Sequence, residues 1–146
     1  MITFRPIQPL KESEAIERKN KHRNLTKQEL AREGIVLLSE TVVSQNKGYS
    51  LLAKSVDDER KEGDVKIKDF YVGITNDLVD RKYKHEHDDH GGKSIKAMYA
   101  VRCESCEVAK ALEDVFGSLG LNKGKGPAGN GAADDTDFVY IYRIPR

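Results

Sequence analysis

Apolar and polar residues follow two different periods along this sequence of 146 residues. Apolar residues recur at helical spacing in residues 27–43 and 105–119, which predicts two amphipathic helices. Alternating or continuously apolar runs predict strands at 49–55, 65–74, 95–102 and 137–144. A further helix is expected to begin at Thr75 or Asn76 and to end near His87. The predicted order is helix, strand, strand, helix, strand, helix, strand.

Capping and turn residues mark the ends of several of these elements. Thr26 followed by Glu29 forms a capping box at the start of the first helix, and Ser105 is placed to cap the last one. Gly34 is a weak point inside the first helix. Residues 57–64 are charged and are expected to form a hairpin loop between the first two strands.

Together these elements predict the fold class α/β: a small mixed, largely antiparallel β-sheet flanked by helices, with an N-terminal helical extension. Residues 1–45 are expected to form an N-terminal arm and helix, in which the polar residues 10–24 are either a solvated helix or a disordered arm. Residues 46–146 are expected to form one compact unit, with a Gly-rich tract at 121–137 before the last strand.

Composition narrows the class of protein. Charged residues make up 34% of the chain and hydrophobic residues 38%, so a core can form beneath a highly ionised surface. The net charge of +1 excludes attraction of nucleic acid by the whole molecule, but basic residues are concentrated in 11–32 and 81–102. Two cysteines cannot make a disulfide scaffold, and no segment is apolar enough for a signal peptide or a membrane span. We therefore expect a cytoplasmic protein with no membrane partner.

The richest candidate chemistry lies where the second predicted strand passes into a helix. The helix places Asp77, Arg81 and His85 on one face, each four residues apart. It begins just after a strand that ends in Tyr71-Val72-Gly73, so a helix N-terminus, a guanidinium and an imidazole converge on one small area. That combination suits an anion such as phosphate. The alternative is a solvated Asp77–Arg81 pair, which would stabilise the helix by a few tenths of a kcal/mol.

Glu113 is the second candidate. On a helical wheel it lies at the edge of the apolar stripe of the last helix, near Leu112 and Phe116. It is either a carboxylate that reaches outward from the rim or a half-buried ligand for a hard cation such as Mg²⁺, which keeps several of its waters.

A competing interpretation is a zinc site. Three histidines precede a Cys-x-x-Cys pair, and together they are His85, His87, His90, Cys103 and Cys106. Such a group could bind zinc and stabilise an interaction domain. The other explanation is that both cysteines are small buried residues at the end of a strand and the start of a helix.

The segment YVGITNDLVDRKYKH, residues 71–85, resembles the core of the GIY-YIG nuclease superfamily. In that family a Tyr-x-Gly strand is followed by a helix with an Arg and often a His. Gly48-Tyr49 is similar to the Gly-x-Tyr element of an earlier strand, without its middle residue. Glu113 in AKALEDVF is similar to the metal-binding Glu, and Asn122 resembles a late Asn that precedes a Gly-rich stretch. The resemblance spans residues 48–131.

The resemblance implies a divalent-metal-dependent endonuclease that hydrolyses phosphodiester bonds in double-stranded DNA, with Mg²⁺ or Mn²⁺ bound by Glu113. It implies that Arg81 contacts the phosphate and that Tyr49 is the base or positions the water, with Tyr71 orienting the same network. A phenol, with an ordinary pKa of about 10, needs nearby cations or a proton acceptor such as His85 to act as a base. The resemblance leaves open which tyrosine is the base, and Asn122 completes the implied site.

Basic residues near the predicted site are candidate contacts to the nucleic-acid backbone, namely Lys82, Lys84, Lys123 and Lys125. Besides the zinc-stabilised interaction domain, two alternatives to a DNA endonuclease share its fold: a relative that binds nucleic acid without cleaving it, and a relative that cleaves RNA. A dimer is possible, and the role in restriction, mobility or repair is open.

Overall fold

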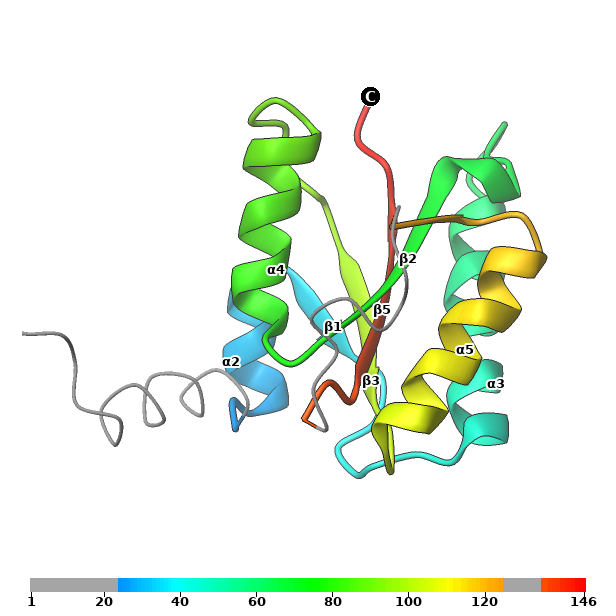
Figure 1. Cartoon of the computed structure of the whole chain (residues 1–146). Helices are drawn as coiled ribbons and strands as arrows, with labels where there is room; N and C mark the ends of the chain where they lie inside the picture. Colours follow the sequence, from blue (N-terminus) through cyan, green and yellow to red (C-terminus); the bar gives the residue numbers. More distant parts are fainter. Residues whose placement is uncertain (1–23, 125–134) are drawn as a thin grey trace, which may run out of the picture.

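An open five-stranded sheet lies between two layers of helices in the computed structural model of the chain (Figure 1). The structure describes residues 24–124 and 135–146. Its helices are α2 (Lys27–Arg32), α3 (Gln45–Arg60), α4 (Leu78–Lys84) and α5 (Cys106–Ser118). Its strands are β1 (Ile35–Leu37), β2 (Phe70–Thr75), β3 (Met98–Arg102), β4 (Asn122–Lys123) and β5 (Phe138–Arg143). This is a mixed α/β fold, as the sequence predicts.

The strands follow the order β1-β3-β5-β2-β4 across the sheet. β5 is the central strand and runs antiparallel to both β3 and β2, with Gly73 of β2 opposite Tyr140 of β5. The short outer strands are parallel to their neighbours, β1 to β3 and β4 to β2. The longer pairings are therefore antiparallel, and the expected mixed, largely antiparallel sheet is confirmed.

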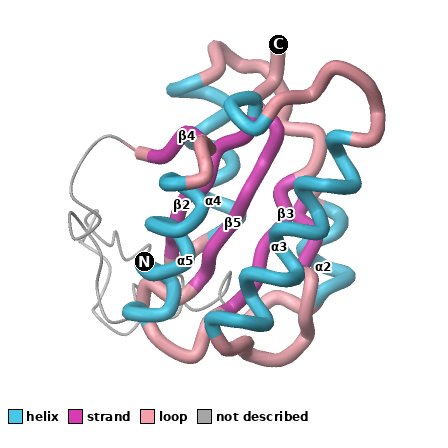
Figure 2. Tube along the Cα trace, turned by 90° about the vertical axis from the view of Figure 1, so that its right-hand side faces the viewer, coloured by secondary structure: helices cyan, strands magenta, loops and turns pink. Residues whose placement is uncertain are grey.

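Each face of the sheet has its own core. α3 and α5 cover one face and α2 and α4 the other (Figures 1 and 2). Successive side chains of a strand point to opposite faces, so β5 supplies Val139 and Ile141 to the α3/α5 core, and Tyr140 and Tyr142 to the α2/α4 core. The α2/α4 core thus contains two buried phenols, which brings polar groups into an apolar layer.

The N-terminal region differs from its prediction after residue 32. The capping box is confirmed, because the Thr26 hydroxyl accepts from the Glu29 N–H and the Glu29 carboxylate from the Thr26 N–H, both at 3.1 Å. The expected helix to residue 43 is wrong: Gly34 has φ +72° and ends it, and β1 follows. β1 pairs with β3, so the boundary expected at residue 45 lies within the sheet fold. The arm expected at 1–23 lies outside the described residues.

The strand predicted at 49–55 is also wrong, because these residues belong to helix α3. Ser44 caps α3 by accepting a hydrogen bond from the Lys47 N–H at 3.3 Å, and the helix continues through the first half of the expected hairpin loop at 57–64. Its buried positions include Gly48, Leu52 and Val56, four residues apart, which is a helical spacing. Gly48 permits a close crossing of α5, since a Cβ there would lie 2.9 Å from a methyl carbon of Leu112.

The other predicted elements are present. The helix expected near 75–87 is α4 with one further turn, the strands expected at 95–102 and 137–144 are β3 and β5, and the helix expected at 105–119 is α5. The strand expected at 65–74 forms only in its second half, as β2, after a 3₁₀ turn at Ile67–Asp69. β4 was not predicted. No helix in the described part of the chain is long and apolar enough to cross a membrane.

Candidate active site

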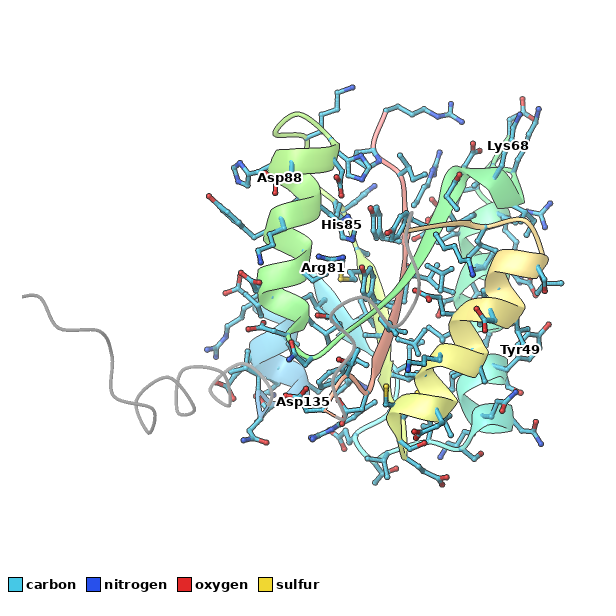
Figure 3. The ribbon with its side chains drawn as sticks, in the orientation of Figure 1. Tyr49, Lys68, Arg81, His85, Asp88 and Asp135 are labelled. Carbon is cyan, nitrogen blue, oxygen red and sulfur yellow. The ribbon has the colours of Figure 1, made fainter. Side chains whose placement is uncertain are left out.

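Two polar side chains of the α4 layer, His85 and Arg81, meet at the hydroxyl of Tyr140, and a third, Asp89, contacts His85. The Nε2 atom of His85 lies 2.7 Å from this hydroxyl, and the Nε–H of Arg81 donates to it at 3.4 Å. The other imidazole nitrogen, Nδ1, lies 2.6 Å from the Oδ2 atom of Asp89. Arg81 and His85 both extend from α4 toward the sheet (Figure 3). The structure therefore brings together the guanidinium and imidazole that the sequence placed on one helix face.

The local sequence explains how α4 presents these groups. Asp77, rather than Thr75 or Asn76, is the N-cap, and its carboxylate accepts from the Asp80 N–H at 3.0 Å. After Lys84 the helix widens into one π-helical turn, His85–Asp89, closed by the His90 N–H on the His85 carbonyl at 3.0 Å. Such turns are rare and occur often at functional sites.

Tyr140 has room for its hydroxyl because β2 carries a glycine opposite it. A Cβ atom at Gly73 would overlap the hydroxyl and the adjoining ring carbon of Tyr140. The Tyr-Val-Gly sequence that the resemblance uses thus has a steric reason in this fold. Any larger residue at position 73 would displace the phenol from His85 and Arg81.

Further aromatic rings surround this centre. The ring of Tyr71 lies edge-on to the imidazole of His85, with centroids 4.7 Å apart, and stacks on Tyr142 at 5.3 Å. The hydroxyl of Tyr142 lies 2.8 Å from Nε2 of His90. Tyr71 is partly exposed, whereas Tyr140 and Tyr142 are completely buried. The cluster thus holds two His–Tyr pairs and one phenol that reaches the surface.

Burial keeps the centre of this cluster uncharged. Desolvation lowers the pKa of His85 below its usual value, although the hydrogen bond to Asp89 acts in the opposite direction. Desolvation also raises the pKa of Tyr71 and that of Tyr140. At neutral pH the imidazole of His85 is therefore neutral, and both phenols keep their protons. In the free protein both shifts oppose transfer of the Tyr140 proton to His85, because they make the phenol a weaker acid and the imidazole a weaker base.

Glu113 lies on α5, in the helix layer on the opposite face of the sheet from Arg81 and His85. Its side chain is buried, with 7% exposure, and burial raises the pKa of its carboxyl, while the positive charges of Lys123 and Arg81 lower it. Within the described residues no hydrogen bond or ion pair satisfies this carboxylate. Its charge also raises the pKa of Tyr71 and that of Tyr140, where desolvation is the largest cause and Glu113 the smallest. The carboxylate of Glu113 therefore acts on these phenols only weakly, across the sheet.

A divalent cation fits this carboxylate. A buried acid without a partner among residues 24–124 and 135–146 would be stabilised by a cation. The same part of the chain holds no group of three or more His, Cys, Asp or Glu side chains arranged for a metal. Glu113 would therefore be the single protein ligand that these residues supply. Mg²⁺ tolerates this, because it is often bound by one or two carboxylates, with water and substrate oxygens as its other ligands.

Two of the predicted site residues have other surroundings. Tyr49 lies on α3, where its ring stacks on Phe116 with centroids 5.3 Å apart, on the side of the sheet opposite to Arg81 (Figure 3). Asn122 lies in β4, and its side-chain amide donates to the carbonyls of Lys68, at 2.7 Å, and Phe70, at 3.3 Å. Asn122 thereby fastens β4 to the start of β2, which is a structural contact.

The candidate lysines are engaged with acidic neighbours. The amino groups of Lys82, Lys84 and Lys123 each lie 3.1 Å from a carboxylate oxygen, of Glu86, Asp80 and Asp114 respectively. The Lys82 pair is mostly buried and holds the end of α4, because Glu86 also accepts from the Ile95 N–H at 2.7 Å. Lys84 and Lys123 remain exposed enough to exchange partners. Lys125 lies outside the described residues.

The zinc interpretation finds no site in the described segments, which contain all five of its residues. Both cysteines are buried and reduced, and burial raises the pKa of the Cys103 thiol to about 12, whereas zinc requires a thiolate. His85 and His90 bind tyrosines, and His87 packs against the ring of Tyr83 with centroids 4.1 Å apart. The Cys-x-x-Cys pair is part of the packing around α5.

Tyr140, Tyr142 and Asp89 are the residues that the sequence interpretation missed. The signal for the tyrosines was the alternation in FVYIYR, which puts both phenols on one face of a strand. The signal for Asp89 was its spacing of four residues from His85. Neither pattern shows that β5 lies beside β2, since that pairing joins residues far apart in the chain.

Comparison with known proteins identified no relative of this chain. A scan of protein-family models, a search of curated proteins and a search of solved structures each returned no match. The case for function therefore depends on the geometry of these side chains.

Proposed function

We propose that this site hydrolyses phosphodiester bonds in DNA as a divalent-metal-dependent endonuclease, with the chemistry of the GIY-YIG nucleases. The observation that carries the proposal is the phenol of Tyr140, which lies 2.7 Å from a proton acceptor, His85, and 3.4 Å from a guanidinium, Arg81. Such a phenol can lose its proton to one neighbour while the other stabilises the resulting oxyanion.

Tyr140 is proposed to take the role that the resemblance gave to Tyr49. The resemblance calls for a tyrosine on a strand near the Tyr-x-Gly strand, and Tyr49 lies on a helix in the other layer. Tyr140 lies on the strand antiparallel to β2 and directly opposite Gly73. This role for Tyr140 would explain why a glycine is required at that point of β2.

The proposed reaction needs a nucleophilic water, stabilisation of the negative charge that builds on the phosphate, and help for the leaving oxygen. His85 takes the proton of Tyr140, and the phenolate then takes a proton from the attacking water, which must reach this hydroxyl when substrate binds because Tyr140 is completely buried in the free protein. Arg81 uses its Nε–H for Tyr140, and no described residue accepts from its two Nη groups, which can bind the phosphate as a fork. A Mg²⁺ or Mn²⁺ ion bound to Glu113 would supply Lewis-acid polarisation of the phosphate.

A plasmid assay tests the proposal. Purified protein is incubated with supercoiled DNA in Mg²⁺, in Mn²⁺ and in EDTA, and nicked and linear products are followed with time. We expect cleavage with either metal and none in EDTA. Tyr140→Phe should abolish cleavage, whereas the matched change Tyr83→Phe, at an exposed tyrosine of α4, should leave it unchanged.

The same assay separates the alternatives. DNA binding without cleavage in any metal would favour a non-catalytic relative and contradict the proposal. Cleavage of a single-stranded or duplex RNA of the same sequence, with DNA left intact, would instead identify an RNA-cleaving enzyme. Full activity in Tyr140→Phe would remove the phenol from the reaction even if DNA is cut.

A further inference from the structure

Asp89, which lies outside the residues so far given a role, contacts the far side of the imidazole of His85. Its Oδ2 atom is 2.6 Å from Nδ1, while Nε2 on the opposite side of the ring is 2.7 Å from the Tyr140 hydroxyl. The two residues are the first and the last of the π-helical turn, and a spacing of four residues along a helix brings side chains together. The imidazole thus lies between a carboxylate and a phenol.

The identity of these partners fixes the direction of each hydrogen bond. An ionised carboxylate can only accept, so Nδ1 of His85 must carry the proton and donate to Asp89. A neutral imidazole then presents Nε2 as an acceptor, and the Tyr140 hydroxyl must donate to it. The Arg81 Nε–H in turn donates to the Tyr140 oxygen. The chain of donors runs from Arg81 through Tyr140 and His85 to Asp89.

We propose that Asp89 is a positioning residue that holds His85 in the Nδ1–H tautomer, so that Nε2 remains free to take the proton of Tyr140. This inference rests on the proposed function, in which Tyr140 acts as the base. When the proton moves, the O–H bond of Tyr140 breaks, an N–H bond forms at Nε2, and the electron pair stays on the phenolate oxygen. The new imidazolium lies beside Asp89 and the new phenolate beside Arg81, so each charge that forms has an opposite neighbour.

The charged and titratable groups around His85 are few. From its own helix they are Arg81, Asp89 and His90, and from the strands they are Tyr71, Tyr140 and Tyr142. Asp89 is the only anion among these neighbours within the described residues. Removing it while keeping its shape therefore tests its role directly.

The first measurement is independent of cleavage. The ¹⁵N shifts of His85 are recorded by NMR on the full chain near pH 7.5, where the imidazole is neutral. Wild type should show a protonated Nδ1 and an unprotonated Nε2. In Asp89→Asn the amide can donate to Nδ1 as well as accept from it, so the Nδ1–H tautomer should no longer be the dominant form. Asp88→Asn, which removes the same charge from the exposed neighbouring residue, should keep the wild-type tautomer.

Tyr140→Phe provides a second check. It removes the partner of Nε2 and leaves Asp89 in place, so the Nδ1–H tautomer should persist. Loss of that tautomer in Tyr140→Phe, or its retention at the wild-type level in Asp89→Asn, would overturn the inference. If wild-type protein fails to cleave nucleic acid, the proposed function fails, but these shifts still decide what Asp89 does to His85.

The kinetic measurement is single-turnover cleavage at saturating protein. Asp89→Asn should slow cleavage by about ten- to a hundredfold, as is typical when the partner that orients a histidine is removed. DNA affinity and thermal unfolding should remain near those of Asp88→Asn. Asp89→Glu keeps a carboxylate and should restore part of the rate. Wild-type cleavage by Asp89→Asn would show that the contact with His85 is only a surface ion pair.

Discussion

The surroundings of Tyr140 illustrate how much of the candidate site depends on single residues. The phenol has no exposed surface, and its hydroxyl is positioned by Gly73 beneath it and by His85 and Arg81 beside it. The raised pKa of Tyr140 means that its hydroxyl is protonated in the free protein and cannot act as a base there. The proton leaves only when a negative charge on Tyr140 is matched by positive charge nearby.

Arg81→Lys tests the fork of the guanidinium. Lysine keeps the charge but cannot give two parallel hydrogen bonds to phosphate, and it loses the Nε–H contact with Tyr140. DNA binding should barely change, whereas the single-turnover rate should fall by about a hundredfold or more, the cost of one oxyanion donor. Lys84→Arg, on the exposed side of the same helix, should leave both values unchanged. Near wild-type turnover by Arg81→Lys would remove this arginine from the site.

Glu113→Gln tests the carboxylate that is proposed to bind the metal. It should abolish cleavage but increase the stability of the fold. We expect loss of cleavage, because the divalent cation loses its carboxylate ligand. Burial raises the pKa of Glu113 in the folded state, so the folded protein binds this proton more tightly than the unfolded chain does. The ionised side chain therefore destabilises the fold increasingly as the pH rises above the ordinary glutamate pKa.

In the absence of divalent metal, Glu113→Gln should therefore raise the melting temperature at pH 7 and have little effect near pH 4. Thermal unfolding followed by circular dichroism at both pH values measures this difference. Glu107→Gln is the control, because Glu107 lies in the first turn of α5, where a negative charge is favourable. A destabilised Glu113→Gln protein at pH 7 would show that the carboxylate has a favourable partner in the free protein.

Helices and strands place these residues, and α5 is the element whose ends are best defined. Ser105 caps it by accepting from the Val108 N–H at 3.2 Å. Ser105→Ala should reduce the free energy of unfolding by about 1 kcal/mol, the usual value of such a cap. Urea denaturation measures the change. Ser118→Ala at the other end of α5 should cost less than about 0.5 kcal/mol, because that residue is exposed. Equal losses would mean that the Ser105 hydroxyl does not cap α5.

The success of each prediction from the sequence follows from how local its signal is. α5 has a serine cap and an apolar stripe within fifteen residues, and it forms as predicted. Residues 49–55 contain a short apolar run that is compatible with a strand or a helix. In the structure they are helical, and the adjacent Gly48 packs closely on Leu112, a residue far away in the sequence. Such a contact cannot be read from the local pattern. The Arg81–His85 spacing was readable because it lies on one helix. The role of Tyr140 was not readable, because it depends on a partner strand nearly seventy residues away.

The net charge of the molecule is close to zero, but its basic residues are concentrated in particular segments of the chain. The net charge is +1, and the described lysines near the site are paired with carboxylates. The basic residues of the N-terminal segment, by contrast, come before the first described helix. Under the proposed function, much of the sequence-independent attraction for a nucleic-acid backbone would come from that segment.

A truncation that removes residues 1–23 tests this division. The logarithm of DNA affinity is measured against the logarithm of salt concentration for the full chain and the truncated chain. The slope should become shallower after truncation, because fewer phosphate contacts release fewer counterions. Circular dichroism should show that the sheet fold is retained. A slope equal to that of the full chain would mean that the N-terminal residues do not contact the DNA backbone.

The central position of β5 has a consequence for the order in which the protein can be made. Among the described residues β5 comes later in the chain than β2 and β3, yet both depend on it as their shared neighbour. Until β5 has been synthesised, the edges of β2 and β3 that pair with it have unpaired N–H and C=O groups. Such pairing between distant residues slows folding, and unpaired strand edges favour association with other chains. Tyr140 arrives with the same strand. A nascent chain that already carries Arg81, His85 and Glu113 therefore has no complete candidate site until β5 has been synthesised as well.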